Sequence, residues 1–208
     1  NKSQNGVLDL KDWLGNMNEL QTLVMPDRYK VTSGTGSWPA NLLFLDLGGT
    51  MRFDRNVTDS LLFLPQTLHV LRLPRTYNEE IISLPPKLNK LITGRWFNRR
   101  LRVIPDTLRI LTLGEQFNQI IEAHVLPNTL QILNFGGGFN QLIGMHTLPP
   151  NLQELSLGAK FNQHLPHGVL PTGLKKLFFD KYLGVWNYPL YAPGAEETKE
   201  GCTLPSTL

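Results

Sequence analysis

Leucine and proline recur along the chain at a nearly constant interval. The phrase Leu-Pro-x-x-Leu-x-x-Leu, or a close variant of it, has its proline at positions 39, 65, 85, 105, 127, 149 and 171. From Pro65 onward this interval is 20 to 22 residues. A period of this length indicates a solenoid, because each repeat is one structural unit that buries its apolar face only against its neighbours.

Each repeat contains the signals of one short strand followed by a turn. Leu108 to Asn118, for example, runs Leu-x-x-Leu-x-Leu-Gly-x-x-Phe-Asn. The last two leucines alternate as they do in a strand, and the glycine after them is typical of a turn. We therefore predict a β-rich, leucine-rich-repeat-like solenoid of about seven coils, with one short parallel strand per 20–22-residue coil.

Two further columns of residues are expected at the turn that follows each strand. The aromatic column consists of Tyr77, Phe97, Phe117, Phe139 and Phe161. The asparagine column consists of Asn78, Asn98, Asn118, Asn140 and Asn162. Asparagine amides can satisfy backbone groups that have no strand partner, so we interpret both columns as a structural ladder. Sugar binding by the asparagines is the functional alternative.

These motifs resemble the repeats of the FNIP family, which are related to leucine-rich repeats. Phe117-Asn118-Gln119-Ile120-Ile121 and the corresponding segments at 139–143 and 161–165 carry the resemblance, which is best over Trp38 to Leu177. The family's proline after Gln is replaced by Ile120, Leu142 and His164. The resemblance implies an interaction scaffold of the kind found in amoebae and the large viruses that infect them. It supplies no catalytic residues, and no F-box segment is visible.

The repeats divide the chain into four expected parts. Residues 1–36 form a divergent N-terminal coil or cap, and residues 37–183 form the repeats. Residues 184–203 form a Tyr/Pro-rich insertion and an acidic loop, and residues 204–208 begin a further repeat. Because the chain opens without Met and closes inside a repeat phrase, we expect it to be a fragment.

Composition limits the class of protein. With 41% hydrophobic and 18% charged residues the chain is too apolar for intrinsic disorder, yet no apolar stretch is long enough to cross a bilayer. Its one cysteine, Cys202, has no internal partner, which suits a reducing compartment. These features favour a cytoplasmic, intracellular protein, and association with a virion is an alternative location.

Candidate chemistry is sparse. No constellation of nucleophile, base and orienting group stands out, so we expect neither an enzyme nor a cofactor. Gly136-Gly137-Gly138 lacks the Lys-Ser/Thr that follows a phosphate-binding loop, which favours a turn. His124 and His146 occupy equivalent repeat positions with His167 nearby, as in a zinc site, but no Cys or carboxylate matches them, so no metal site is predicted.

Basic residues concentrate between Lys87 and Arg109, where seven of the 20 basic residues of the chain fall. The candidate binding residues in this run are Arg95, Trp96, Arg99, Arg100 and Arg102. An acidic protein partner is the functional interpretation and a solvated edge is the structural one. We do not expect nucleic acid as the partner, because a net charge of +3 does not provide a long basic groove.

Alternation along the strands predicts which side chains face outward. Val70, Ile92, Ile110 and Ile132 form an apolar group next to Arg72 and Lys90. An apolar group rimmed by charge is typical of a protein-binding face, although parallel strands favour β-branched residues in any case. We predict a protein-interaction module. The alternative is a structural or cementing component of a larger assembly such as a viral particle, with end-to-end contacts through open sheet edges.

Overall fold

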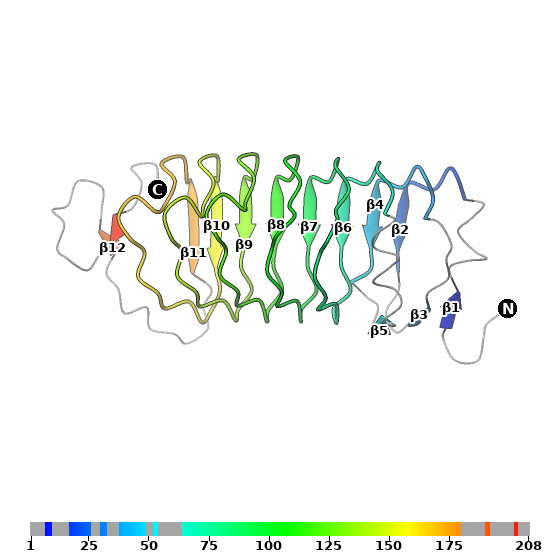
Figure 1. Cartoon of the computed structure of the whole chain (residues 1–208), viewed down its shortest axis with the longest axis horizontal. Helices are drawn as coiled ribbons and strands as arrows, with labels where there is room; N and C mark the ends of the chain where they lie inside the picture. The colour runs from blue at the N-terminus through cyan, green and yellow to red at the C-terminus, as the bar shows by residue number, and fades with distance from the viewer. Residues whose placement is uncertain are drawn as a thin grey trace.

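The computed structural model describes residues 17–25, 38–48 and 64–179, and the backbone of short strands at 7–9, 30–32, 52–53, 190–191 and 202–203. The main feature is an eight-stranded parallel sheet in which each strand belongs to one coil (Figure 1). In spatial order its strands are β2 (Thr22–Val24), β4 (Phe44–Asp46), β6 (Val70–Arg72), β7 (Lys90–Ile92), β8 (Ile110–Thr112), β9 (Ile132–Asn134), β10 (Glu154–Leu157) and β11 (Lys176–Phe179). No helix is present in the described residues. The predicted solenoid is confirmed.

The described strands also form two smaller parallel sheets. The first contains β1 (Val7–Asp9), β3 (Lys30–Thr32) and β5 (Arg52–Phe53), and the second contains β12 (Leu190–Tyr191) and β13 (Cys202–Thr203). Most of the expected N-terminal coil at 1–36, most of the insertion and acidic loop at 184–203, and all of the repeat start at 204–208 lie outside the described residues.

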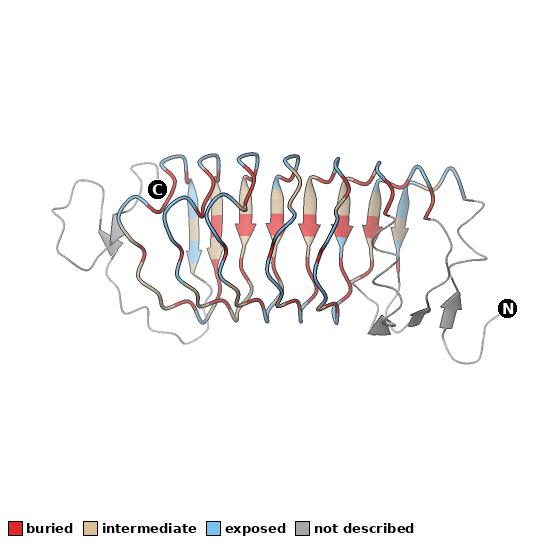
Figure 2. Cartoon of the chain, in the orientation of Figure 1, coloured by how far each residue is buried: buried red, intermediate tan, exposed pale blue. Residues whose placement is uncertain are grey.

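The strands pair in the register that the leucine phrase predicts. Their central leucines are partners from strand to strand, and each is fully buried from β4 to β10: Leu45, Leu71, Leu91, Leu111, Leu133 and Leu155. Each of these leucines is more buried than the strand residue on either side of it, and Figure 2 shows buried and less buried segments alternating along the strands. Because the flanking residues alternate outward, they form the solvent-facing side of the sheet.

The aromatic column fills the core beside the turns. Successive rings from Tyr77 to Phe161 are stacked with centroids 5.9–6.3 Å apart and interplanar angles of 6–17°. Phe135 adds a further ring, whose centroid lies 3.8 Å from that of Phe139. No coil can bury these rings alone, so stacking of neighbouring coils stabilises the solenoid.

The asparagine column forms a hydrogen-bonded ladder next to these rings. The backbone N–H of Asn98 donates to Asn78 Oδ1 at 2.8 Å, and that of Asn118 donates to Asn98 Oδ1 at 2.9 Å. The same bond recurs at the next two steps, to Asn140 and to Asn162. Each bond links one coil to the next and satisfies a turn N–H that has no strand partner.

Gly136 packs closely against the preceding coil. A Cβ at this residue would lie 2.0 Å from the carbonyl oxygen of Gly114, so only glycine fits. This contact supports a turn at Gly136-Gly137-Gly138.

Within the described residues, no helix is long and apolar enough to span a membrane.

Candidate binding surfaces

The strand face brings the four predicted apolar residues together. Val70, Ile110 and Ile132 lie in one column with Lys90, and Ile92 lies in the adjacent column next to Arg72. All four apolar side chains are half-buried, because neighbours on the sheet cover part of each. The result is a partly exposed apolar strip across β6 to β9, which we call the strand-face strip.

Charged side chains border this strip unevenly. Arg72 pairs with Asp46 at 3.4 Å, and Lys176 pairs with Glu154 at 2.6 Å. Neither Lys90 nor Arg109 forms an ion pair with any residue in the described part of the chain. Lys90 within the strip and Arg109 just before β8 are therefore cations that no carboxylate of the described residues neutralises.

The predicted basic patch is spread around a full coil. Lys90 lies in β7, Arg95 and Trp96 lie in the following turn, and Arg99 and Arg102 lie beyond the asparagine ladder. A run of this length encircles the solenoid once, so closeness in the sequence does not place these residues on one face. Arg99 Nε donates to the Asn78 carbonyl oxygen at 2.8 Å, and an Arg102 guanidinium nitrogen lies 3.9 Å from a Glu80 carboxylate oxygen.

Arg95 and Trp96 line a hollow on the turns, which we call the turn hollow. It has a volume of about 840 Å³ and is lined by Arg75, Thr76, Asn78, Arg95, Trp96, Asn98 and Gln116. Trp96 is 59% exposed, and its backbone N–H donates to the Arg75 carbonyl oxygen at 3.1 Å. Arg75 is not among the predicted binding residues because it lies outside the basic run, although it stands one repeat before Arg95.

His124 and His146 stack as predicted, but His167 does not join their column. Their ring centroids lie 5.5 Å apart at an interplanar angle of 16°. Both have positive φ, 63° and 62°, and the equivalent residue of the next coil is Gly168 with φ 75°. The left-handed region costs a residue other than glycine about 1–2 kcal/mol, and histidine is among the residues that tolerate it best.

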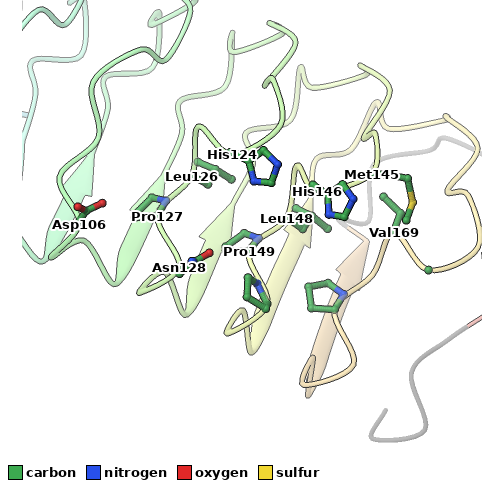
Figure 3. A pocket seen from close by; sticks show the side chains of 13 residues that line it. Asp106, His124, Leu126, Pro127, Asn128, Met145, His146, Leu148, Pro149 and Val169 are labelled. Carbon is green, nitrogen blue, oxygen red and sulfur yellow. The ribbon is translucent and has the colours of Figure 1, made fainter.

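The two histidines line a groove of about 510 Å³ in which proline and aliphatic side chains predominate (Figure 3). The coil from β8 to β9 is two residues longer than the coil from β7 to β8, and the extra residues lie between Ile121 and Leu126. The left-handed residue thus belongs to the longer coils. No group of three potential metal ligands occurs among the residues that the structure describes.

Stacked coils with one parallel strand each define the class of protein as a leucine-rich-repeat-like β-solenoid. More specifically, the chain belongs to the FNIP repeat family: the FNIP Repeat pattern matches residues 77–116, 97–138 and 139–182, together about half of the chain. This confirms the family resemblance seen in the sequence.

Two solved structures have a similar fold. The chain superposes on CroV588, described as a novel circular LRR protein, with a TM-score of 0.65 and 28% identity over 85% of this chain and 31% of that one. It superposes on YopM from Yersinia enterocolitica WA-314 with a TM-score of 0.55 and 23% identity, over 80% of this chain and 39% of that one. The chain thus spans only about a third of the length of these proteins. Comparison with curated proteins gives no match.

The family and the fold together indicate a general class of function. The chain is a leucine-rich-repeat-like scaffold, an architecture typical of protein-binding modules and generally non-catalytic. In such scaffolds the stacked coils provide extended surfaces, so the candidate sites are the strand face and the turns rather than an enclosed cavity.

Proposed function

We propose that this chain is a non-enzymatic protein-protein interaction module that binds an acidic protein partner through its strand face. The observation that carries the proposal is the strand-face strip, in which Val70, Ile110 and Ile132 stand in register around Lys90. A partly exposed apolar group surrounded by polar side chains is the usual composition of a protein interface.

The charge of the surrounding residues supports an acidic partner. Lys90 and Arg109 have no ion-pair partner in the described part of the chain, so a partner carboxylate need not displace one. A hollow of about 490 Å³ beside the start of the strands is lined by Arg109, Gln131, Gln153 and Lys175, among others, and by no carboxylate. This arrangement of donors favours carboxylates from a partner and raises the association rate with an acidic surface.

The test is affinity capture from native extract with a double variant, Ile110→Asp and Ile132→Asp. Two carboxylates on the solvent-facing strip should abolish capture of the partner, and high salt should weaken capture by the parent protein. The matched control is Ile120→Asp with Leu142→Asp, because these side chains are 59% and 62% exposed and lie outside the strand face. Far-UV circular dichroism checks that both double variants fold.

The outcomes separate the proposal from its alternatives. Loss of capture in the strand-face variant alone supports the proposed interface. Equal capture by both double variants, or equal loss in both, contradicts it. Recovery of only one large particle, together with self-association in light scattering of the purified chain, favours the structural or cementing role instead.

A further inference from the structure

We propose that the turn hollow binds a phosphotyrosine side chain in an exposed segment of the protein partner. The hollow lies at the turns that follow β6 and β7, and it combines two guanidinium groups with an exposed indole. The inference rests on the proposed function, because the occupant is part of a protein partner. It concerns a different surface from the strand-face strip.

The hollow presents hydrogen-bond donors and no carboxylate in its lining. Arg75 and Arg95 stand at equivalent positions of successive coils, with Thr76 and Gln116 beside them. Two guanidinium groups recognise a dianionic phosphate more strongly than a single carboxylate, because each forms charge-assisted hydrogen bonds with its oxygens. Arg75 has no ion pair within the described residues.

The other basic member of the hollow is already paired. A guanidinium nitrogen of Arg95 lies 2.7 Å from a carboxylate oxygen of Glu115, and both side chains are largely exposed. Exposed pairs of this kind contribute at most about 1 kcal/mol, so a phosphate can take Arg95 from Glu115 at little cost.

The asparagine ladder supplies further donors. The Oδ1 atoms of Asn78 and Asn98 accept hydrogen bonds from the ladder. Neither Nδ2 group makes a hydrogen bond in the described part of the chain, and both residues line the hollow. These amides add neutral donors to the lining that holds the guanidinium groups.

The fold does not require these side chains. Trp96 N–H donates to the Arg75 carbonyl oxygen, and the equivalent bonds recur in the next two coils, from Gln116 to Arg95 and from Gly138 to Glu115. Because the turns have the same backbone bonds with such different residues, the Arg and Trp side chains at the hollow are not explained by folding. An exposed tryptophan flanked by arginines is typical of a binding site.

The Trp96 indole favours a phosphate that is attached to an aromatic ring. Trp96 offers a flat apolar surface on which an aromatic ring can stack, and phosphotyrosine carries its phosphate on such a ring. A free nucleotide also joins a ring to a phosphate, but the hollow is open and has a single aromatic side chain in its lining. A small ligand needs an enclosing pocket, whereas a peptide gains contacts from its flanking residues.

The test is fluorescence anisotropy with labelled short peptides that have degenerate flanks and a fixed central phosphotyrosine, tyrosine or phosphoserine. We expect the phosphotyrosine pool to bind about tenfold more tightly than either other pool. Arg75→Ala and Trp96→Ala should each weaken binding several-fold. Lys160→Ala is the matched control, because Lys160 is exposed and occupies the position of Trp96 three coils further on.

Several results would overturn the inference. Equal binding of the three pools, or binding that neither Arg75→Ala nor Trp96→Ala weakens, excludes a phosphotyrosine site. Competition by AMP at lower concentration than by the phosphotyrosine pool assigns the hollow to a nucleotide instead. The strand-face double variant should still bind the phosphopeptides, so failure of the strand-face proposal and failure of this inference give different results.

Discussion

Replacing Gly136 with alanine tests how closely the coils pack. The Cβ of the new residue would lie 2.0 Å from the Gly114 carbonyl oxygen and 2.4 Å from its carbonyl carbon. Both are backbone atoms of the preceding coil, which no change of rotamer can move away. The two coils must therefore separate locally by roughly 1 Å, against a strand spacing of about 4.8 Å that the sheet hydrogen bonds maintain.

The size of the effect follows from the bonds that this separation breaks. Gly138 N–H donates to the Glu115 carbonyl oxygen at 2.8 Å next to the contact, and β8 pairs with β9 on the other side of it. Losing two hydrogen bonds costs about 2 kcal/mol, and overpacking adds roughly 1–3 kcal/mol. We expect Gly136→Ala to lower the free energy of unfolding by about 3–5 kcal/mol.

The adjacent glycine provides the control. A Cβ at Gly137 would meet nothing closer than the Ala159 Cβ at 3.9 Å, and the φ of Gly137 is not positive. Alanine there should be neutral or should stabilise the protein by about 0.4–1 kcal/mol, because it restricts the unfolded chain. Urea denaturation followed by circular dichroism compares the two variants with the parent. Equal denaturation midpoints for Gly136→Ala and Gly137→Ala would refute this account of coil packing.

Two further substitutions test the ladder and the buried tyrosine. Asn118→Ala removes the oxygen that accepts hydrogen bonds from Asn140 N–H at 2.9 Å and from Gln141 Nε2 at 3.2 Å. Urea denaturation should show that the free energy of unfolding falls by about 1–3 kcal/mol. An unchanged denaturation midpoint would contradict a structural ladder. Burial, and to a smaller extent the charge of Glu79, raises the pKa of Tyr77 from 10.0 to about 12. Above pH 10 the unfolded chain therefore loses the Tyr77 proton more readily than the folded chain does. The parent should lose roughly 2–3 kcal/mol of stability as the pH rises from 10 to 12. Tyr77→Phe removes this titration, and urea denaturation across that range should show the variant gaining stability relative to the parent; a difference that does not change with pH would contradict it.

The strand registers could be predicted from the sequence because each strand stands at a fixed distance after its proline. The phrase from Pro105 to Leu111 has the same length as the phrase from Pro127 to Leu133. The two residues that lengthen the later coils precede the proline, so they leave the strand columns unchanged. For this reason the column of Val70, Lys90, Ile110 and Ile132 was predictable although the coils differ in length.

The positions of side chains around the coil were less predictable. Spacing shows that Arg95 and Arg102 belong to one coil. The direction in which each side chain points depends on the turn between them, and a turn lacks the two-residue alternation that fixes side-chain direction in a strand. The positive φ of His124 is likewise a property of the longer turn. Arg75 stands one repeat before Arg95 and could have been found from the spacing, but its place beside Trp96 depends on how the turns stack.

Repetition separates the residues that build the solenoid from those that are free to bind. An inward position meets the same neighbours in every coil, so Phe97 and Phe117 are both fully buried and their rings stack at 6.1 Å. Outward positions on the turns are less uniform. The residue equivalent to Trp96 becomes Gln116, then Gly138, where a Cβ would lie too close to the Glu115 carbonyl oxygen, and then Lys160. Where an outward column changes while the backbone bonds beneath it stay the same, the fold does not dictate the side chain, so such a position can carry a binding residue. This reasoning favours the turn hollow over the Asn118 ladder as a site, because the ladder repeats the same residue in register and uses its amide oxygens within the fold.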